Sequence, residues 1–179
     1  MVKTSANGNI AALIAEKSGI FLDIGCGANR QPGWIGLDIR DLPGVDIVQD
    51  VEEYPWPIPD ESVKTALASH LVEHINPAKF GFINFMNEVW RVMQVGGEFL
   101  IALPHGSSQG YIQDPTHINP CNEATWDYFC PGRASMLWTI YKPKPWAKSS
   151  DIESGGQYGG GTCQTGSRLT ATAAATHPA

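Results

Sequence analysis

Glycines and aspartates follow apolar runs at positions where they could hold a nucleoside. Gly25 and Gly27 come directly after one run and would let the backbone approach a ligand closely, because glycine lacks a Cβ and readily adopts positive φ. Asp38 ends the next run and could accept hydrogen bonds from both hydroxyls of a ribose. Asp50 follows a third run and could accept a hydrogen bond from an adenine amino group.

The link after Gly27 argues against a dinucleotide. A dinucleotide fingerprint requires a third glycine that opens a helix, whereas Ala28-Asn29-Arg30-Gln31-Pro32 stands here. Only about eight residues precede the next strand, too few for a helix that presents its N-terminus to a pyrophosphate. We therefore expect a nucleoside without phosphates rather than NAD.

The stretch His70-Leu71-Val72-Glu73-His74 matches the His-x-x-Glu-His pattern of inverted zinc peptidases. His70 and His74 could bind zinc on one helix face, with Glu73 as the general base. That hypothesis needs a long helix and a third ligand downstream. The motif instead follows a strand, and Pro77 comes soon after it. We therefore expect no metal site and expect Glu73 and His74 to make local contacts.

The polar segment from His105 to Pro120 follows another apolar run, where a second substrate would sit. Long polar loops at such positions often carry function and can close as lids. The candidate catalytic residues there are His105, Asp114 and His117, with Tyr111 as a further substrate contact. An ordinary surface role is the alternative for each of them.

Apolar periodicity indicates the elements that must position these residues. The expected strands are Ile20–Ile24, Trp34–Ile39, Val45–Val48, Val63–Ala68, Phe99–Leu103 and Met136–Tyr141. The expected helices are Asn9–Lys17, Pro77–Met93, stopped by Gly96-Gly97, and Asn122–Phe129. This alternation predicts an α/β fold with a mostly parallel sheet. Because ligands bind at the carboxyl ends of such strands, the candidate residues should meet at one edge.

Several segments, in this order and spacing, resemble the motifs of class I S-adenosylmethionine-dependent methyltransferases. The resemblance is closest to small bacterial and phage-type methyltransferases with a very short link between their first two strands, and it covers about residues 20–141. The segments are Leu22-Asp23-Ile24-Gly25-Cys26-Gly27, Gly36-Leu37-Asp38, Asp50-Val51-Glu52, Ser69-His70-Leu71-Val72-Glu73-His74-Ile75 and Glu88-x-x-Arg91-Val92-Met93-x-x-Gly96-Gly97.

The resemblance implies a seven-stranded Rossmann-like sheet that binds S-adenosylmethionine and transfers its methyl group. The glycine loop would line the methionine and ribose, the acid after the second strand would hold the ribose hydroxyls, and the next acid would flank the adenine. For Asp23, the alternative role is to cap the turn after the first strand. The residues that would contact the cofactor are Asp23, Gly25, Cys26, Gly27, Asp38, Asp50, Val51, Ser69 and His70.

Composition narrows the class of partner. The chain has 179 residues and a formal net charge of −6, which disfavours a broad nucleic-acid surface and favours a small-molecule acceptor. The four cysteines form no Cys-x-x-Cys pair, and Cys26 is expected to fill space rather than act as a nucleophile. No secretory signal is visible, and no run approaches the roughly 18 apolar residues of a membrane span, so a cytoplasmic location is expected. The oligomeric state is left open.

The C-terminal composition changes abruptly. We expect a methyltransferase-like domain over residues 1–146 and a disordered tail over residues 147–179, which are rich in Gly, Ser, Thr and Ala. The sheet is then expected to lack its last strand or strands, as a frameshift would cause. This leads to an alternative hypothesis, a truncated relative that binds the cofactor without methylating anything.

Overall fold

The computed structural model describes residues 3–4, 19–131, 133, 140–154 and 164–173. These residues form an eight-stranded sheet in the order β1-β4-β3-β2-β5-β6-β8-β7. All pairs among β2 to β6 are parallel, whereas β1 and β8 run antiparallel to their neighbours. The predicted mostly parallel α/β fold is therefore confirmed. The strands are β1 (Lys3–Thr4), β2 (Ile20–Ile24), β3 (Ile35–Asp38), β4 (Ile47–Val48), β5 (Val63–Ser69), β6 (Met93–Pro104), β7 (Trp146–Ser154) and β8 (Gln164–Ala171).

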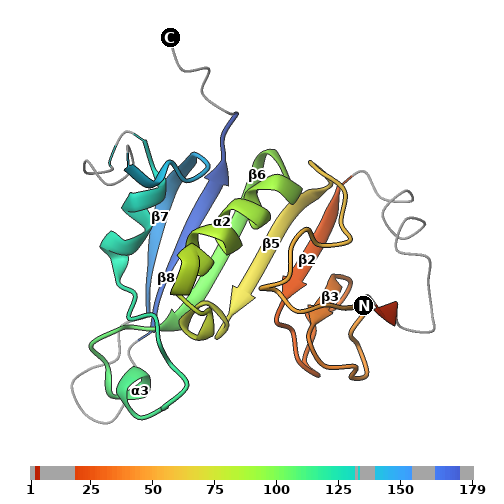
Figure 1. The fold of residues 1–179 in the computed structure, drawn as a ribbon, viewed down its shortest axis with the longest axis horizontal. Coiled ribbons are helices and arrows are strands. Elements are labelled where there is room, and N and C mark those ends of the chain that lie inside the picture. Colours follow the sequence, from red (N-terminus) through yellow and green to blue (C-terminus); the bar gives the residue numbers. More distant parts are fainter. Residues whose placement is uncertain (1–2, 5–18, 132, 134–139, 155–163, 174–179) are drawn as a thin grey trace.

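The parallel strands bring their carboxyl ends to one edge of the sheet. Figure 1 shows the arrowheads of β2, β5 and β6 pointing to the same edge, with the loop that carries the short helix α3 (Gln109–Ile112) hanging beyond it. Helix α2 (Gly81–Val92) crosses one face of the sheet. The site predicted from strand ends therefore has a physical location, the edge that also carries the α3 loop.

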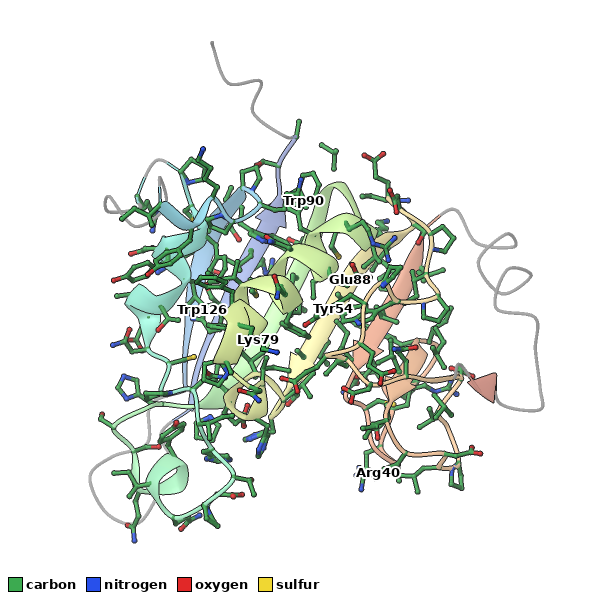
Figure 2. All side chains as sticks on the ribbon, viewed as in Figure 1. Arg40, Tyr54, Lys79, Glu88, Trp90 and Trp126 are labelled. Atoms are coloured by element: carbon green, nitrogen blue, oxygen red, sulfur yellow. The ribbon has the colours of Figure 1, made fainter. Side chains whose placement is uncertain are left out.

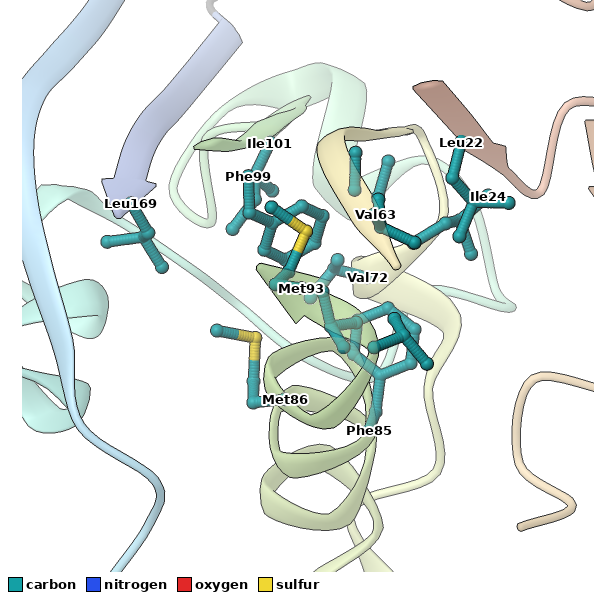
Figure 3. Packing of buried hydrophobic residues seen from close by; sticks show 14 of the residues in the cluster. Leu22, Ile24, Val63, Val72, Phe85, Met86, Met93, Phe99, Ile101 and Leu169 are labelled. Atoms are coloured by element: carbon teal, nitrogen blue, oxygen red, sulfur yellow. The ribbon is translucent and has the colours of Figure 1, made fainter. Parts of the chain in front are cut away.

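The apolar face of α2 packs against the sheet (Figure 3). Phe85, Met86 and Val89 are fully buried, and the ring of Phe85 lies 6.4 Å from that of Phe99 on β6. Burying side chains of this size contributes roughly 1.5–3 kcal/mol each. This packing holds α2 against the two strands, β5 and β6, whose ends lead into the site.

Glu88, a charged residue of α2 (Figure 2), is buried. Its Oε1 accepts a hydrogen bond from the backbone N–H of Trp56 at 2.6 Å and pairs with Nη2 of Arg91 at 2.6 Å. Arg91 also donates to Asp60 at 2.5 Å. The proline-rich turn before β5 is therefore fastened to α2 by a charged network, which the helical pattern alone did not show.

The five strands expected before residue 104 are present as β2 to β6. Helix α2 ends earlier than predicted, because Met93 is buried and already pairs with Val63 of β5, so Gly96 and Gly97 lie inside β6 rather than stopping the helix. The helix expected at Asn122–Phe129 is the 3-10 helix η3 (Glu123–Phe129), and the Asn122 side chain caps it.

The expectation that the sheet lacks its last strands is wrong. Strand β8 pairs antiparallel with β6 in a register that sets Leu169 opposite Phe99, and β7 pairs antiparallel with β8. Residues 147–154 and 164–171 are thus ordered in the sheet, contrary to the expected disordered tail. The edge of β6 is covered, which removes the physical basis for a truncated relative.

Small side chains concealed β8 in the sequence. Ser167, Leu169 and Ala171 are buried and alternate with Arg168 and Thr170, which are not. Because backbone hydrogen bonds make the ladder, a strand can form with one large apolar residue when its neighbour strand supplies the rest of the core. The helix expected at Asn9–Lys17 and residues 136–139 of the expected sixth strand lie outside the described residues, whereas Ile140 and Tyr141 are helical.

Candidate functional site

The glycine loop after β2 folds back onto the end of β3. The backbone N–H groups of Gly25 and Cys26 both donate to the carbonyl of Leu37, at 2.7 and 3.2 Å. Gly25 and Gly27 have φ of +71° and +55°, and a Cβ at Gly25 would meet Leu71 at 3.0 Å. Gly25 therefore needs to be glycine both for its backbone conformation and for its close approach to Leu71 in the loop after β5.

Asp38 at the end of β3 is buried, and its carboxylate is held in place by its neighbours. The backbone N–H of Gly27 donates to Oδ2 at 2.8 Å, and the backbone N–H and Nε of Arg40 donate to Oδ1 at 2.9 and 3.2 Å. Burial raises the pKa of this carboxyl, but these hydrogen bonds and the Arg40 charge outweigh burial and lower the pKa overall. Asp38 is therefore an anion at neutral pH. Arg40 lies at the sheet edge, mostly exposed (Figure 2).

Asp23 and Cys26 have mainly local contacts. Oδ2 of Asp23 accepts a hydrogen bond from the backbone N–H of Gln31 at 2.8 Å, so this carboxylate caps the turn after the glycine loop. Burial raises the pKa of Asp23, and the Gln31 hydrogen bond partly opposes that rise. Burial, together with Asp23 and Asp38, raises the pKa of the Cys26 thiol to about 11. A neutral thiol fits the expected space-filling role.

A cavity of about 230 Å³ opens across the ends of β2, β3, β4 and β5. It brings together four of the predicted cofactor residues, Gly25, Asp38, Asp50 and Val51, and does not include Asp23, Cys26, Gly27, Ser69 or His70. It adds residues that the strand-end argument missed, Ile39, Glu52, Leu71, His74 and Ile75.

The cavity is lined by both acidic and apolar residues. Oδ1 of Asp50 accepts a hydrogen bond from the backbone N–H of Glu52 at 2.9 Å, which fixes the turn after β4. Ile39 lines the cavity and is 61% exposed, and the Leu71 side chain faces Gly25 of the glycine loop. Such an exposed isoleucine directly after a buried strand is the signal that could have found this part of the cavity from the sequence. Acids with exposed apolar groups suit a ligand with both hydroxyls and a flat aromatic ring.

Two of the three predicted catalytic residues meet beside this cavity. Nε2 of His117 lies 3.6 Å from Oδ2 of Asp114 and 4.0 Å from Oε1 of Glu73. The His117 ring packs at 4.7 Å against that of His74, which lines the cavity, and at 5.1 Å against Tyr111. Hydrogen bonds from the Thr116 side chain and backbone lower the pKa of Asp114. The loop predicted to face the second substrate therefore reaches the cofactor candidate site.

His105, the third predicted catalytic residue, contacts a different group. Its Nδ1 accepts a hydrogen bond from the backbone N–H of Ser107 at 3.2 Å, so the neutral ring carries its proton on Nε2. That Nε2 lies 3.7 Å from Oε2 of Glu123, at the start of η3. The structure therefore couples His105 to the start of η3 rather than to the Asp114–His117 pair.

The His-x-x-Glu-His stretch forms no long helix. Only Val72–His74 form a single 3-10 turn, η1, and His70 precedes it with a φ of +53°. The backbone N–H groups of Ile118 and Asn119 donate to the carbonyl of Glu73 at 2.8 and 3.1 Å, which ties the α3 loop to this turn. The helix that an inverted zinc peptidase needs is absent from this segment, so that hypothesis is not supported.

Solved structures with a similar fold include several methyltransferases. A methyltransferase dependent on S-adenosylmethionine from Archaeoglobus fulgidus matches with a TM-score of 0.56 and 15% identity, over 91% of this chain and 95% of that one. A 1,6-didemethyltoxoflavin-N1-methyltransferase from Burkholderia thailandensis, solved with S-adenosylhomocysteine, matches with a TM-score of 0.60 and 12% identity, over 92% and 76%. The [4+2]-cyclase SpnF matches with a TM-score of 0.56 and 13% identity, over 91% and 80%.

No protein-family model and no curated protein sequence matches the chain. The likeness at these identities is one of fold, that of class I S-adenosylmethionine-dependent methyltransferases. Among the described residues, none of the helices has the length and apolar content to cross a membrane.

Proposed function

We propose that this chain, which has the class I methyltransferase fold, binds S-adenosylmethionine and transfers its methyl group to a small-molecule acceptor. The observation that carries the proposal is the cavity across four strand ends. The anionic Asp38 lies there beside a loop whose conformation at Gly25 requires glycine. The cytoplasmic location and the small-molecule acceptor rest on composition and are part of the same proposal.

The residues present fit this cofactor. A carboxylate can accept about four hydrogen bonds, and Asp38 accepts three, from Gly27 N–H and from the backbone N–H and Nε of Arg40. The Arg40 side chain is exposed and can turn away, which frees one of these three positions. Two positions are then available for the two ribose hydroxyls. Ile39 and Val51 line the same cavity and offer apolar contact to an adenine ring beside Asp50. Asp23 would act by holding the loop after Gly27 in place.

Methyl transfer places few chemical demands on the protein. S-adenosylmethionine supplies a methyl group on a sulfonium, which is already electrophilic. The residues of the chain have to align the acceptor with that methyl group and exclude water, and the α3 loop is positioned for both. When the acceptor carries a proton at neutral pH, the Asp114–His117 pair is the polar group best placed to accept it.

Calorimetric titration with S-adenosylmethionine tests the proposal. We expect saturable binding by the wild-type chain and binding about 10- to 100-fold weaker for Asp38→Asn, because charge-assisted hydrogen bonds to the ribose are lost. The exposed neighbour Asp41 lines no part of the cavity, so Asp41→Asn is the matched control and should bind as wild type. Folded protein that does not bind, or equal binding by both variants, would contradict the proposal.

Turnover separates an enzyme from a cofactor-binding protein. Formation of S-adenosylhomocysteine in the presence of candidate acceptors shows methyl transfer, whereas binding without turnover over a broad acceptor set favours a non-methylating role. The likeness to a [4+2]-cyclase shows that the fold by itself does not decide between them. The hypothesis of an impaired protein was based on missing strands, and it loses that support because β7 and β8 extend the sheet beyond β6.

A further inference from the structure

A buried carboxylate beside the cavity lacks hydrogen bonds. Glu73 is fully buried, and among the described residues neither of its carboxylate oxygens accepts a hydrogen bond. Nδ1 of His70 and Nε2 of His117 approach Oε1, at 3.4 and 4.0 Å. Removing a carboxylate from water without hydrogen bonds or a cation is costly. The position of Glu73 therefore favours a positive charge close to its oxygens.

Two histidines near this carboxylate have their Nδ1 atoms turned to backbone carbonyls. Nδ1 of His117 lies 3.0 Å from the carbonyl of Tyr111. Nδ1 of His74 lies 3.3 Å from the carbonyl of Thr116 and 3.1 Å from its Oγ1, which donates its own proton to Oδ1 of Asp114. These partners accept, so each neutral ring carries its proton on Nδ1 and keeps a lone pair on Nε2. This is the arrangement of a metal-ligating histidine, whose other nitrogen donates to a carbonyl that orients the ring.

The three side chains converge on one point. One potential ligand atom from each of Glu73, His74 and His117 lies within 4.8 Å of the others. A tetrahedral zinc ion with bonds of about 2.1 Å sets its donor atoms roughly 3.4 Å apart, so the widest pair has to close by at most about 1.4 Å. His74 is exposed, and rotation of its side chain can supply such a movement.

We propose that Glu73, His74 and His117 bind a divalent transition-metal ion such as zinc. Two imidazoles and one carboxylate are ligands that such ions prefer, and three protein ligands leave a coordination position open. Because His74 lines the cofactor cavity, that position lies beside it, where an oxygen or nitrogen of an acceptor can bind. Oδ2 of Asp114, 3.6 Å from Nε2 of His117, is available as a fourth ligand or as a partner for bound water.

This site differs from the peptidase motif in the sequence. The third ligand is His117 of the α3 loop, not His70, and the ligands come from a 3-10 turn and a loop rather than from one helix. In the metal-bound protein, Nε2 of His117 holds the ion and does not accept a proton. An acidic acceptor group bound to the ion would then lose its proton more readily. Metal binding itself does not depend on the methyltransferase proposal.

Metal titration of the untagged full chain tests the inference. We expect one Zn²⁺ per chain by calorimetry, and we expect Co²⁺ to give visible absorption bands without the near-ultraviolet band of a thiolate ligand. His74→Gln and His117→Gln should each weaken binding by at least about 100-fold, more than the loss of an outer-shell partner. His105→Gln removes a histidine outside the cluster and should bind as wild type. Absent saturable binding, or equal binding by His117→Gln, would overturn the inference.

A stability readout keeps the test decisive if a variant folds poorly. Zn²⁺ should raise the Tm of the wild-type chain and of His105→Gln, but not that of His117→Gln, because an ion that binds only the folded state stabilises it. A cluster held by protonated histidines alone would show neither binding nor a Tm rise, which would also overturn the inference. Titrating S-adenosylmethionine into the same proteins separates the two proposals, since each can fail while the other holds.

Discussion

At the scale of single residues, two features fix the glycine loop: the steric limits at Gly25 and the hydrogen bond from Gly27 to the Asp38 carboxylate. The loop carries two demands at Gly25, a φ of +71° and a Cβ position 3.0 Å from Leu71. Asp38 joins the loop to β3 through the backbone N–H of Gly27. Both features can be tested by substitutions that separate one physical cause from another.

Gly25→Ala should lower the free energy of unfolding more than the same substitution at another glycine with positive φ. We expect a stability loss of about 1–3 kcal/mol by denaturant unfolding, and weaker binding of S-adenosylmethionine, because backbone strain adds to the contact with Leu71. Gly33 has a similar φ of +80° with nothing within 4 Å of its Cβ position, so Gly33→Ala isolates the strain and should leave binding unchanged. Equal effects of the two substitutions would show that close approach at Gly25 does not matter.

The pH dependence of stability should report Asp38. Its pKa is lowered from 3.8 in the folded chain, so its contribution to stability is present above that unfolded value and is lost as the pH falls through the folded pKa. The Tm difference between wild type and Asp38→Asn should therefore be constant from neutral pH down to about pH 5 and shrink below pH 4. A difference that grows on acidification would contradict the hydrogen-bonding scheme.

At the scale of elements, α2 is fastened by more than its apolar face. The carboxylate of Glu88 joins the turn at Trp56 to Arg91. The hydrogen bond from Arg91 to Glu88 raises the pKa of the Arg91 guanidinium and outweighs burial, which lowers that pKa. Since Phe85 and Met86 lie in the preceding turn of the helix and belong to the core, the network and the core fix the same element. The helix thereby holds β5 and β6, whose ends lead to Leu71 and His105.

Glu88→Ala should destabilise the fold far more than removal of an exposed ion pair. We expect a loss of about 2–4 kcal/mol in unfolding free energy, because Arg91 and the backbone N–H of Trp56 lose their partner. Glu98→Ala breaks the half-exposed pair with Arg168 and should cost less than about 1 kcal/mol. Chemical denaturation of both variants measures the difference, and similar losses would argue against a buried network at Glu88.

At the scale of the whole molecule, the C-terminal hairpin closes the sheet. Strand β8 covers the C-terminal part of β6, from Glu98 opposite Thr170 to Pro104 opposite Gln164. Trp146 of β7 is buried 5.8 Å from the ring of Phe99. The core therefore continues into the segment whose composition suggested a disordered tail.

Leu169→Ala tests whether this segment belongs to the core. We expect a loss of about 2–4 kcal/mol in unfolding free energy, because a fully buried leucine leaves a cavity against Phe99. Arg168→Ala, at the adjacent position facing away from the core, should cost less than about 1 kcal/mol. An unchanged Tm for Leu169→Ala would restore the view that residues 164–171 lie outside the fold.

The sequence by itself determined the fold class and four positions of the cavity. Short apolar runs closed by Gly25, Asp38 and Asp50 carry both the strand pattern and the ligand chemistry, so local signals were enough. In parallel strands those ends must meet at one edge, and they do.

Only the tertiary structure decided the last strands and the cluster at Glu73. Strand β8 depends on the core that β6 offers to Leu169, which no local pattern of small residues reveals. His117 lies 44 positions after Glu73 in the sequence. It is brought beside Glu73 where the backbone N–H groups of Ile118 and Asn119 donate to the Glu73 carbonyl. Such long-range pairings cost chain entropy that packing elsewhere has to offset, so they are properties of the whole fold rather than of any segment.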